Sequence, residues 1–219
     1  MAFSQKTLDF LMENRINDSK LWFNEHRADY NELVRDPMRR FVEALVPVFG
    51  SIDPMIVCDP VRSVSRIFRD ARYSKTIFRE TLWCSFSRDK HNPGLIPGYF
   101  FEITPAGFSY GCGCYNACTD YMSTMRRLIL ADSPLFGDAR EALAASDFLM
   151  ADTRYKRTRH PDAPEWQREW LDQRSPCILR ESGDLGVLFS EELPETLGAE
   201  FLAVKPYYDF LLFVSHSVE

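Results

Sequence analysis

The chain has 219 residues, of which 45% are hydrophobic and 14% aromatic, and its 26 basic residues against 32 acidic ones give a formal net charge of −6. A chain of this size and composition can bury one sizeable core, which excludes a disordered, collagen-like or coiled-coil protein. Six cysteines are too few for a secreted disulfide scaffold, so we expect reduced thiols and a cytoplasmic location.

The first fifty residues show helical patterns. Ser4 can cap a first helix, and Asn17 or Asp18 can begin a second one. Asp36 before Pro37 is a further start signal, because it places a capping residue before a proline at the first helical position. We therefore expect three successive helices in this region.

The middle of the chain, from about Val61 to Tyr115, shows short, aromatic and often alternating patterns. Alternation with period two predicts strands over residues 82–87, 99–103 and 108–114. Thr104–Gly107 is a turn signal between the second and third of these segments. The pattern therefore predicts an antiparallel hairpin.

Helical patterns return in the second half of the chain. The expected elements are helices from about Thr119, after Ser133-Pro134 and after Pro164, an extended basic segment over Arg154–Arg159, a strand over Cys177–Leu179, and closing helices over Ser190–Phe201 and Lys205–Val214. Helices followed by strands and again by helices are typical of an α+β fold with a mostly antiparallel sheet. We expect a single domain over residues 1–219, with the N-terminal and C-terminal helices packed on the sheet.

Positive charge is concentrated in the window 61–79. This window has a net charge of +5, from Arg62, Arg66, Arg69, Arg72, Lys75 and Arg79 against Asp70. Arginine presents a fork of donors that suits carboxylate and phosphate groups, so the cluster predicts an anionic small-molecule ligand held by Arg66, Arg69, Arg72 and Lys75. The alternative is that the arginines are paired with carboxylates inside a structural or protein-interaction domain.

Asp70 is the single carboxylate inside this cluster. We expect it to accept hydrogen bonds from a neighbouring arginine or from backbone N–H groups, and so to fix the local geometry. The other arginines would then stay free to face a ligand. If Arg72 is one of these, Arg72→Ala should cost less stability and more ligand binding than Asp70→Ala. If the site is partly buried, replacing Asp70 by Ala should cost a few kcal/mol through the charge left unpaired.

The segment Arg66-Ile67-Phe68-Arg69-Asp70-Ala71-Arg72-Tyr73 resembles the signature of a bacterial family, domain of unknown function 2461. Lys75 and Phe78 resemble the end of that signature, with Ser74 in place of its usual acid and Ile77 in place of a proline. Further similar positions are Phe10-Leu11, Asn14, Trp22-Phe23, Tyr30, Pro37, Phe41, Gly111, Gly113 and Tyr115. The resemblance extends over nearly the whole chain, and it implies no established activity, cofactor or catalytic residues.

Gly111 and Gly113 end a predicted strand just before a predicted helix. Glycines let a backbone approach a ligand closely, and the first N–H groups of a helix favour anions, so both are candidate ligand-binding residues. Glycines in strands also mark bulges or close packing between strands, and this alternative stays open.

Two other motifs give weaker signals for chemistry. Gly107–Gly111 fits the pattern of a nucleophile elbow around Ser109, but this serine falls in an alternating strand pattern, which argues against a serine hydrolase. Cys112, Cys114 and Cys118 have no second cluster of ligands to complete a zinc site. We therefore expect neither a metal nor a cofactor.

The partners that the sequence predicts are correspondingly few. Nucleic-acid binding is disfavoured by the acidic balance and would need the basic segment Arg154–Arg159 to join the arginine cluster in one stripe. A membrane partner is not expected, because the N-terminus lacks the pattern of a signal peptide and no apolar run approaches the length of a bilayer span. Whether the protein is an enzyme, and its oligomeric state, are not determined by the sequence.

Overall fold

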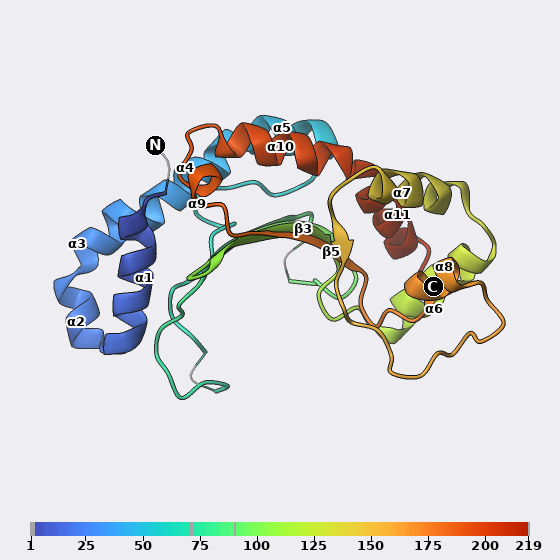
Figure 1. The fold of residues 1–219 in the computed structure, drawn as a ribbon, viewed down its shortest axis with the longest axis horizontal. Coiled ribbons are helices and arrows are strands. Elements are labelled where there is room, and N and C mark those ends of the chain that lie inside the picture. The colour runs from blue at the N-terminus through green and yellow to red at the C-terminus, as the bar shows by residue number, and fades with distance from the viewer. Residues whose placement is uncertain (1–2, 71, 90, 219) are drawn as a thin grey trace. The chain divides into compact units, whose positions relative to one another are not determined.

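The computed structural model describes residues 3–70, 72–89 and 91–218 (Figure 1). The chain forms two compact units, each assembled from three segments. The first unit comprises Met1–Phe86, Phe100–Tyr110 and Glu181–Gly198, and the second comprises Ser87–Tyr99, Gly111–Arg180 and Ala199–Glu219. Segments that are distant in the sequence therefore meet within each unit.

The N-terminal helices of the first unit follow the predicted start signals only in part. Helix α1 (Gln5–Asn17) follows Ser4, as predicted. Helix α2 (Lys20–Glu25) begins after Ser19, whose side chain accepts a hydrogen bond from the Trp22 N–H. The predicted start at Asn17 or Asp18 is therefore wrong by one or two residues, because Asp18 ends α1 in a left-handed conformation with φ of 45°.

Helix α4 (Asp36–Ala44) begins at the predicted start signal, with Pro37 in its first turn, but Asp36 does not cap it and no break precedes it. Helix α3 (Arg27–Tyr30), the π-helical turn η1 (Asn31–Arg35) and α4 follow one another without a break. Pro37 has no N–H to donate to the carbonyl of Leu33, four residues earlier. The hydroxyl of Thr7 in α1 donates to that carbonyl instead, at 2.8 Å. The η1 turn and this bond together accommodate the proline inside a continuous helix.

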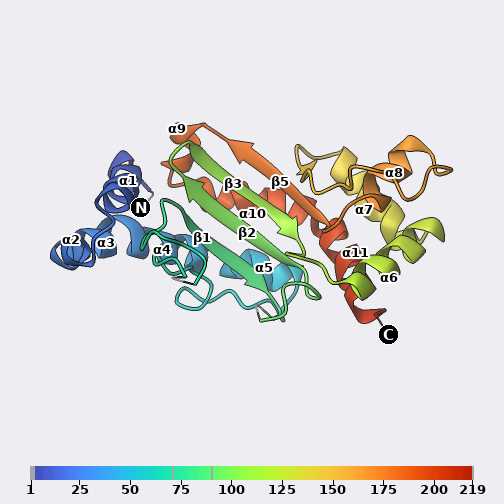
Figure 2. The ribbon, with the colours of Figure 1, turned by 90° about the horizontal axis from the view of Figure 1, so that it is seen from below.

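The sheet has five strands in the order β1-β2-β3-β5-β4. The strands are β1 (Leu82–Ser87), β2 (Gly98–Thr104), β3 (Gly107–Gly113), β4 (Leu149–Met150) and β5 (Cys177–Ser182). The arrows of β1, β2, β3 and β5 alternate in direction in Figure 2, and β4 pairs antiparallel with β5. Strands β2 and β3 form the hairpin predicted around Thr104–Gly107, whereas no sequence pattern predicts the two-residue strand β4.

Aromatic side chains join the N-terminal helices to the sheet in the first unit. Phe41 of α4 packs on Phe101 of β2 with their ring centres 4.5 Å apart, and Phe49 of helix α5 (Val46–Ile52) packs on Phe86 of β1 at 4.2 Å. All four rings are buried. These contacts form the centre of the first unit's core.

The second unit contains helices α6 (Thr119–Leu130), α7 (Pro134–Ala144), α8 (Glu165–Leu171) and α11 (Lys205–His216), while α9 (Leu185–Leu188) belongs to the first unit and α10 (Leu193–Ala203) has residues in both. Phe201 and Tyr208, from the two C-terminal helices, pack on Tyr99 of β2 with ring centres 5.3 and 5.2 Å apart. Helices from both ends of the chain therefore pack on the sheet, as predicted for this α+β fold. None of the described helices is both long and apolar enough to cross a bilayer.

Candidate anion-binding site

The arginine-rich motif lies on a loop of the first unit, between α5 and β1. Phe68 pairs with Phe78 in an antiparallel bridge, and one backbone hydrogen bond flanks this bridge on either side. Residues 67–79 therefore fold back on themselves as a short hairpin. Ala71, inside the motif, lies outside the described residues.

Asp18 fastens this loop to the N-terminal helices. Its Oδ1 accepts hydrogen bonds from the backbone N–H groups of Ile77 and Phe78, at 2.8 and 3.0 Å. Phe23 of α2 packs on Phe68 and Phe78, with ring centres 5.5 and 5.0 Å apart. The loop is thus held by a carboxylate and by a cluster of three aromatic rings.

Arg69 is engaged inside the first unit. Its Nε donates to the carbonyl of Phe78 at 3.0 Å, and its Nη2 lies 3.6 Å from Oε1 of Glu80. Glu80 also accepts a hydrogen bond from Nε of Arg15 in α1, at 3.1 Å. This arrangement supports the structural alternative for Arg69.

Arg72 and Asp70 form an exposed pair. Nε of Arg72 lies 3.0 Å from one carboxylate oxygen of Asp70, and Nη2 lies 2.6 Å from the other. These side-chain hydrogen bonds, followed by the one from the Arg72 backbone N–H, lower the pKa of Asp70 to about 2. The prediction that Asp70 orients a neighbouring arginine is confirmed. Arg72 is therefore not one of the arginines left free for a ligand, because its backbone and side chain both reach the carboxylate two residues earlier.

Arg66 and Lys75 are two further exposed cations on this loop. Neither forms a hydrogen bond or an ion pair with any residue that the structure describes. Tyr73, between them in the sequence, is 83% exposed. These cations, and not the paired arginines, are the part of the loop that is available to an anion.

Gly111 and Gly113 lie in β3 of the second unit, where the backbone of β5 comes very close. A β-carbon on Gly111 would lie 2.0 Å from the carbonyl oxygen of Ile178, and one on Gly113 would lie 2.4 Å from that of Pro176. The close packing of the two strands is by itself enough to require glycine at both positions, whether or not a ligand binds there. Their role in ligand binding stays a prediction.

The serine motif and the first cysteine of the cysteine motif, Cys112, lie in strand β3. Ser109 lies in the middle of β3, so the strand-turn-helix geometry of a nucleophile elbow does not form around it. All six cysteines are free thiols, and burial raises the pKa of Cys112 well above its usual range and that of Cys114 to about 12. These two thiols therefore stay protonated and unreactive at neutral pH. The described residues contain no cluster of three or more side chains that could hold a metal ion.

A cavity of about 700 Å³ opens in the second unit, where the basic segment Arg154–Arg159 runs beside the residues that follow α8. The Tyr155 N–H donates to the carbonyl of Asp172 at 2.9 Å, and the Arg174 N–H donates to that of Thr153 at 3.2 Å. The two backbone segments are therefore paired like strands, and side chains from both line the cavity.

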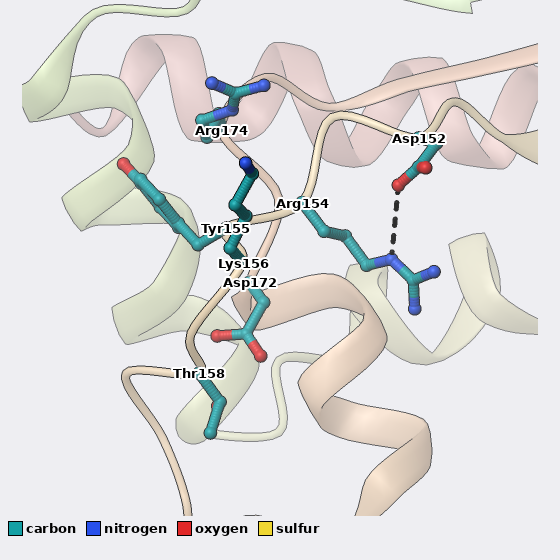
Figure 3. A pocket seen from close by; sticks show the side chains of 7 residues that line it. All are labelled: Asp152, Arg154, Tyr155, Lys156, Thr158, Asp172 and Arg174. Atoms are coloured by element: carbon teal, nitrogen blue, oxygen red, sulfur yellow. Dashed lines mark ion pairs between the residues drawn. The ribbon is translucent and has the colours of Figure 1, made fainter.

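The cavity carries more positive than negative charge. Its lining residues are Asp152, Arg154, Tyr155, Lys156, Thr158, Asp172 and Arg174 (Figure 3). Figure 3 shows Arg154 turned toward Asp152, with which it forms an ion pair at 3.6 Å. Lys156 forms no hydrogen bond or ion pair with any described residue, and Arg174 donates from its side chain only to the carbonyl of Thr153 at 2.9 Å. Two cations of the cavity therefore have no carboxylate partner within the described chain.

Arg126 of α6 holds the backbone that follows α8, next to the cavity, in place. Its guanidinium donates hydrogen bonds of 2.8 Å to the carbonyls of Leu171 and Gln173, at the end of α8. The guanidinium groups of Arg126 and Arg159 also lie 5.9 and 4.2 Å from the centre of the Tyr155 ring. These contacts give the lining residues a defined arrangement before any ligand binds.

Only some of the residues that line this cavity can be recognised from the sequence. The extended basic segment Arg154–Arg159 is visible as a run of charges, but Asp172 and Arg174 belong to no motif. They reach the cavity because the backbone after α8 pairs with that segment, which is a tertiary contact with no local signal in the sequence.

The fold and the site together define an α+β protein with a basic cavity in its second unit. Residues 6–210 match the model of the family described as conserved hypothetical protein (DUF2461), and the chain belongs to this family. Neither the curated proteins nor the solved structures include a significant match to the chain.

Proposed function

We propose that this protein binds a small molecule that carries a phosphate or carboxylate group, and that the ligand occupies the basic cavity of the second unit. The observation that carries the proposal is the pair of cations, Lys156 and Arg174, that line the cavity without a carboxylate partner in the described chain. Anions with several acceptor oxygens bind such groups through charge-assisted hydrogen bonds. The volume of about 700 Å³ suits a small molecule.

The rigidity of the surrounding structure supports this choice. Arg126 ties α6 to the end of α8, and Tyr155 and Arg174 are held by backbone pairing between their segments. A site whose parts are already in place loses little conformational entropy when a ligand binds. Little of the free energy gained from the contacts with the ligand is then offset by ordering the site, so the affinity is higher.

The loop of the arginine-rich motif is the second candidate. Arg66 and Lys75 are exposed and without partners among the described residues, so they offer positive charge to an anion. Arg69 and Arg72, by contrast, already bind the carboxylates of Glu80 and Asp70. We therefore assign these two arginines to the structure of the loop and rank the cavity first.

Isothermal titration of the protein with inorganic phosphate, at constant ionic strength, tests the proposal. Lys156→Ala should weaken binding by about tenfold or more, because a charge-assisted hydrogen bond is lost. The matched control is Arg157→Ala, which removes the same charge from the neighbouring position, outside the cavity lining. This control should change the affinity by no more than about twofold, the effect expected of a screened surface charge.

Three results would overturn the assignment. If wild-type protein does not bind phosphate, or if Lys156→Ala and Arg157→Ala weaken binding equally, the cavity is not the anion site. A loss of binding in the double variant Arg66→Ala, Lys75→Ala with none in Lys156→Ala would place the site on the loop instead.

A further inference from the structure

Asp172 is a carboxylate at the base of the basic cavity. Asp172 is only 8% exposed, and it is one of the residues that line the cavity. Its Oδ1 accepts a hydrogen bond from the backbone N–H of Arg159 at 3.2 Å. Its Oδ2 accepts none from the described residues. One oxygen of this carboxylate is therefore left for a group that enters the cavity.

The guanidinium groups of Arg126 and Arg159, two arginines that contact the residues around Asp172, bind other groups than its carboxylate. Arg126 donates to the carbonyls of Leu171 and Gln173, on either side of Asp172 in the sequence, and not to its carboxylate. Arg159 lies over the ring of Tyr155, and Asp172 takes part in no ion pair within the described chain. Oδ2 of Asp172 is not among the fully buried polar atoms that lack a partner, so it stays accessible from the cavity and can bind a cation there.

The backbone around Asp172 does not favour a negative charge there. Asp172 is the C-terminal cap of α8, and its N–H donates to the carbonyl of Arg168. The C-terminal end of a helix carries a partial negative charge, so a carboxylate there is in an unfavourable position. The hydrogen bond from Arg159 could be accepted equally well by an uncharged asparagine. The fold by itself therefore gives no reason for a negative charge at this position.

We infer that Asp172 binds an amino group of the ligand, so that the ligand is an amine that also carries a phosphate or carboxylate group. This inference rests on the proposed function, because Lys156 and Arg174 are taken to hold the anionic end. The ammonium group would donate to Oδ2 of Asp172 and supply the positive charge that the described chain does not provide there. The anionic group of the ligand would thus face the cations of the cavity, and its ammonium group would face the carboxylate of Asp172.

The test compares aminoalkyl phosphates of two to four methylene groups with alkyl phosphates of the same length, by isothermal titration at neutral pH. At least one amine should bind about tenfold or more tightly than its alkyl partner, the effect of one charge-assisted hydrogen bond. Asp172→Asn keeps the shape and an acceptor for the Arg159 N–H but should abolish this preference. The same variant should bind inorganic phosphate several-fold more tightly, because the cavity loses a negative charge.

Asp162→Asn is the matched control, since it makes the same change in net charge at an exposed residue outside the cavity lining. It should retain the preference for the amine. If no amine binds better than its alkyl partner, or if Asp172→Asn keeps the preference, the inference is wrong, while phosphate binding that depends on Lys156 would leave the proposed function standing. If neither phosphate nor any of these compounds binds, the proposed function fails and the inference fails with it.

Discussion

Arg72 binds Asp70 with its side chain and with its backbone at once. The guanidinium contacts both carboxylate oxygens, and the backbone N–H donates to Oδ1 at 3.0 Å. The side chain of Arg72 is 77% exposed and that of Asp70 is 43% exposed. The condition of partial burial, under which the sequence predicts a large loss of stability on replacing Asp70, is therefore not met. An exposed pair of this kind fixes the shape of a loop and adds little to the stability of the fold.

The pair gives a prediction for titration. The carboxyl of Asp70 should titrate with a pKa of about 2 in the folded protein, below its usual 3.8, because the Arg72 hydrogen bonds favour the charged form. Since the folded pKa is the lower one, the stabilisation is fully present above about pH 4 and is lost as the pH falls toward 2. A ¹³C NMR titration of the carboxyl carbon measures this value. In Arg72→Ala the pKa should rise toward its usual value, and an unchanged pKa would show that the pair does not form in solution.

Asp18 gives a prediction for the stability of the loop. Asp18→Ala removes the acceptor of two backbone N–H groups, those of Ile77 and Phe78, and places a less suitable residue at a φ of 45°. The free energy of unfolding should fall by about 2–4 kcal/mol. Asp18→Asn keeps an acceptor and tolerates the left-handed conformation, so it should cost less than about 1 kcal/mol. Denaturant unfolding of both variants decides the matter, and equal losses would contradict the role of the side chain as an acceptor.

Gly111 tests the close packing of β3 and β5. Gly111→Ala would place a β-carbon 2.0 Å from the carbonyl oxygen of Ile178, so it should destabilise the protein by about 3 kcal/mol or more. Gly137→Ala is the control, because the space around Gly137 in α7 is open. Alanine is the better helix former there and should be neutral or stabilising by up to about 1 kcal/mol. Thermal unfolding in which both variants melt alike would argue against the close approach of the two strands.

The fold was predictable wherever the signal is local. The alternation in residues 99–103 and 108–114, with a turn between them, predicts β2 and β3 closely. The start signal at Asp36-Pro37 coincides with the start of α4, but the chain is helical before it as well, because a distant residue, Thr7, satisfies the carbonyl that the proline leaves free. Strand β4 is two residues long and exists only by pairing with β5, so it has no pattern of its own.

The candidate site was predictable only in part for the same reason. The charge of the arginine-rich loop is visible in the sequence, but the carboxylate of Glu80 and the position of Arg15 on α1, which engage Arg69, depend on the fold. Asp172 and Arg174 enter the cavity through backbone pairing with a segment about twenty residues earlier in the chain. A pattern of charges therefore shows which residues can bind an anion, and the tertiary contacts decide which of them are free to do so.

The most direct test of the account is to map the anion on the protein by NMR. Isotope-labelled protein is titrated with inorganic phosphate at constant ionic strength, and the backbone amide shifts are followed residue by residue. We predict that the amides of residues 152–159 and 172–175 move together with one saturating curve, and that Lys156→Ala removes these changes. Shifts confined to residues 66–79, or shifts that do not saturate, would contradict the central claim that the basic cavity is the anion site.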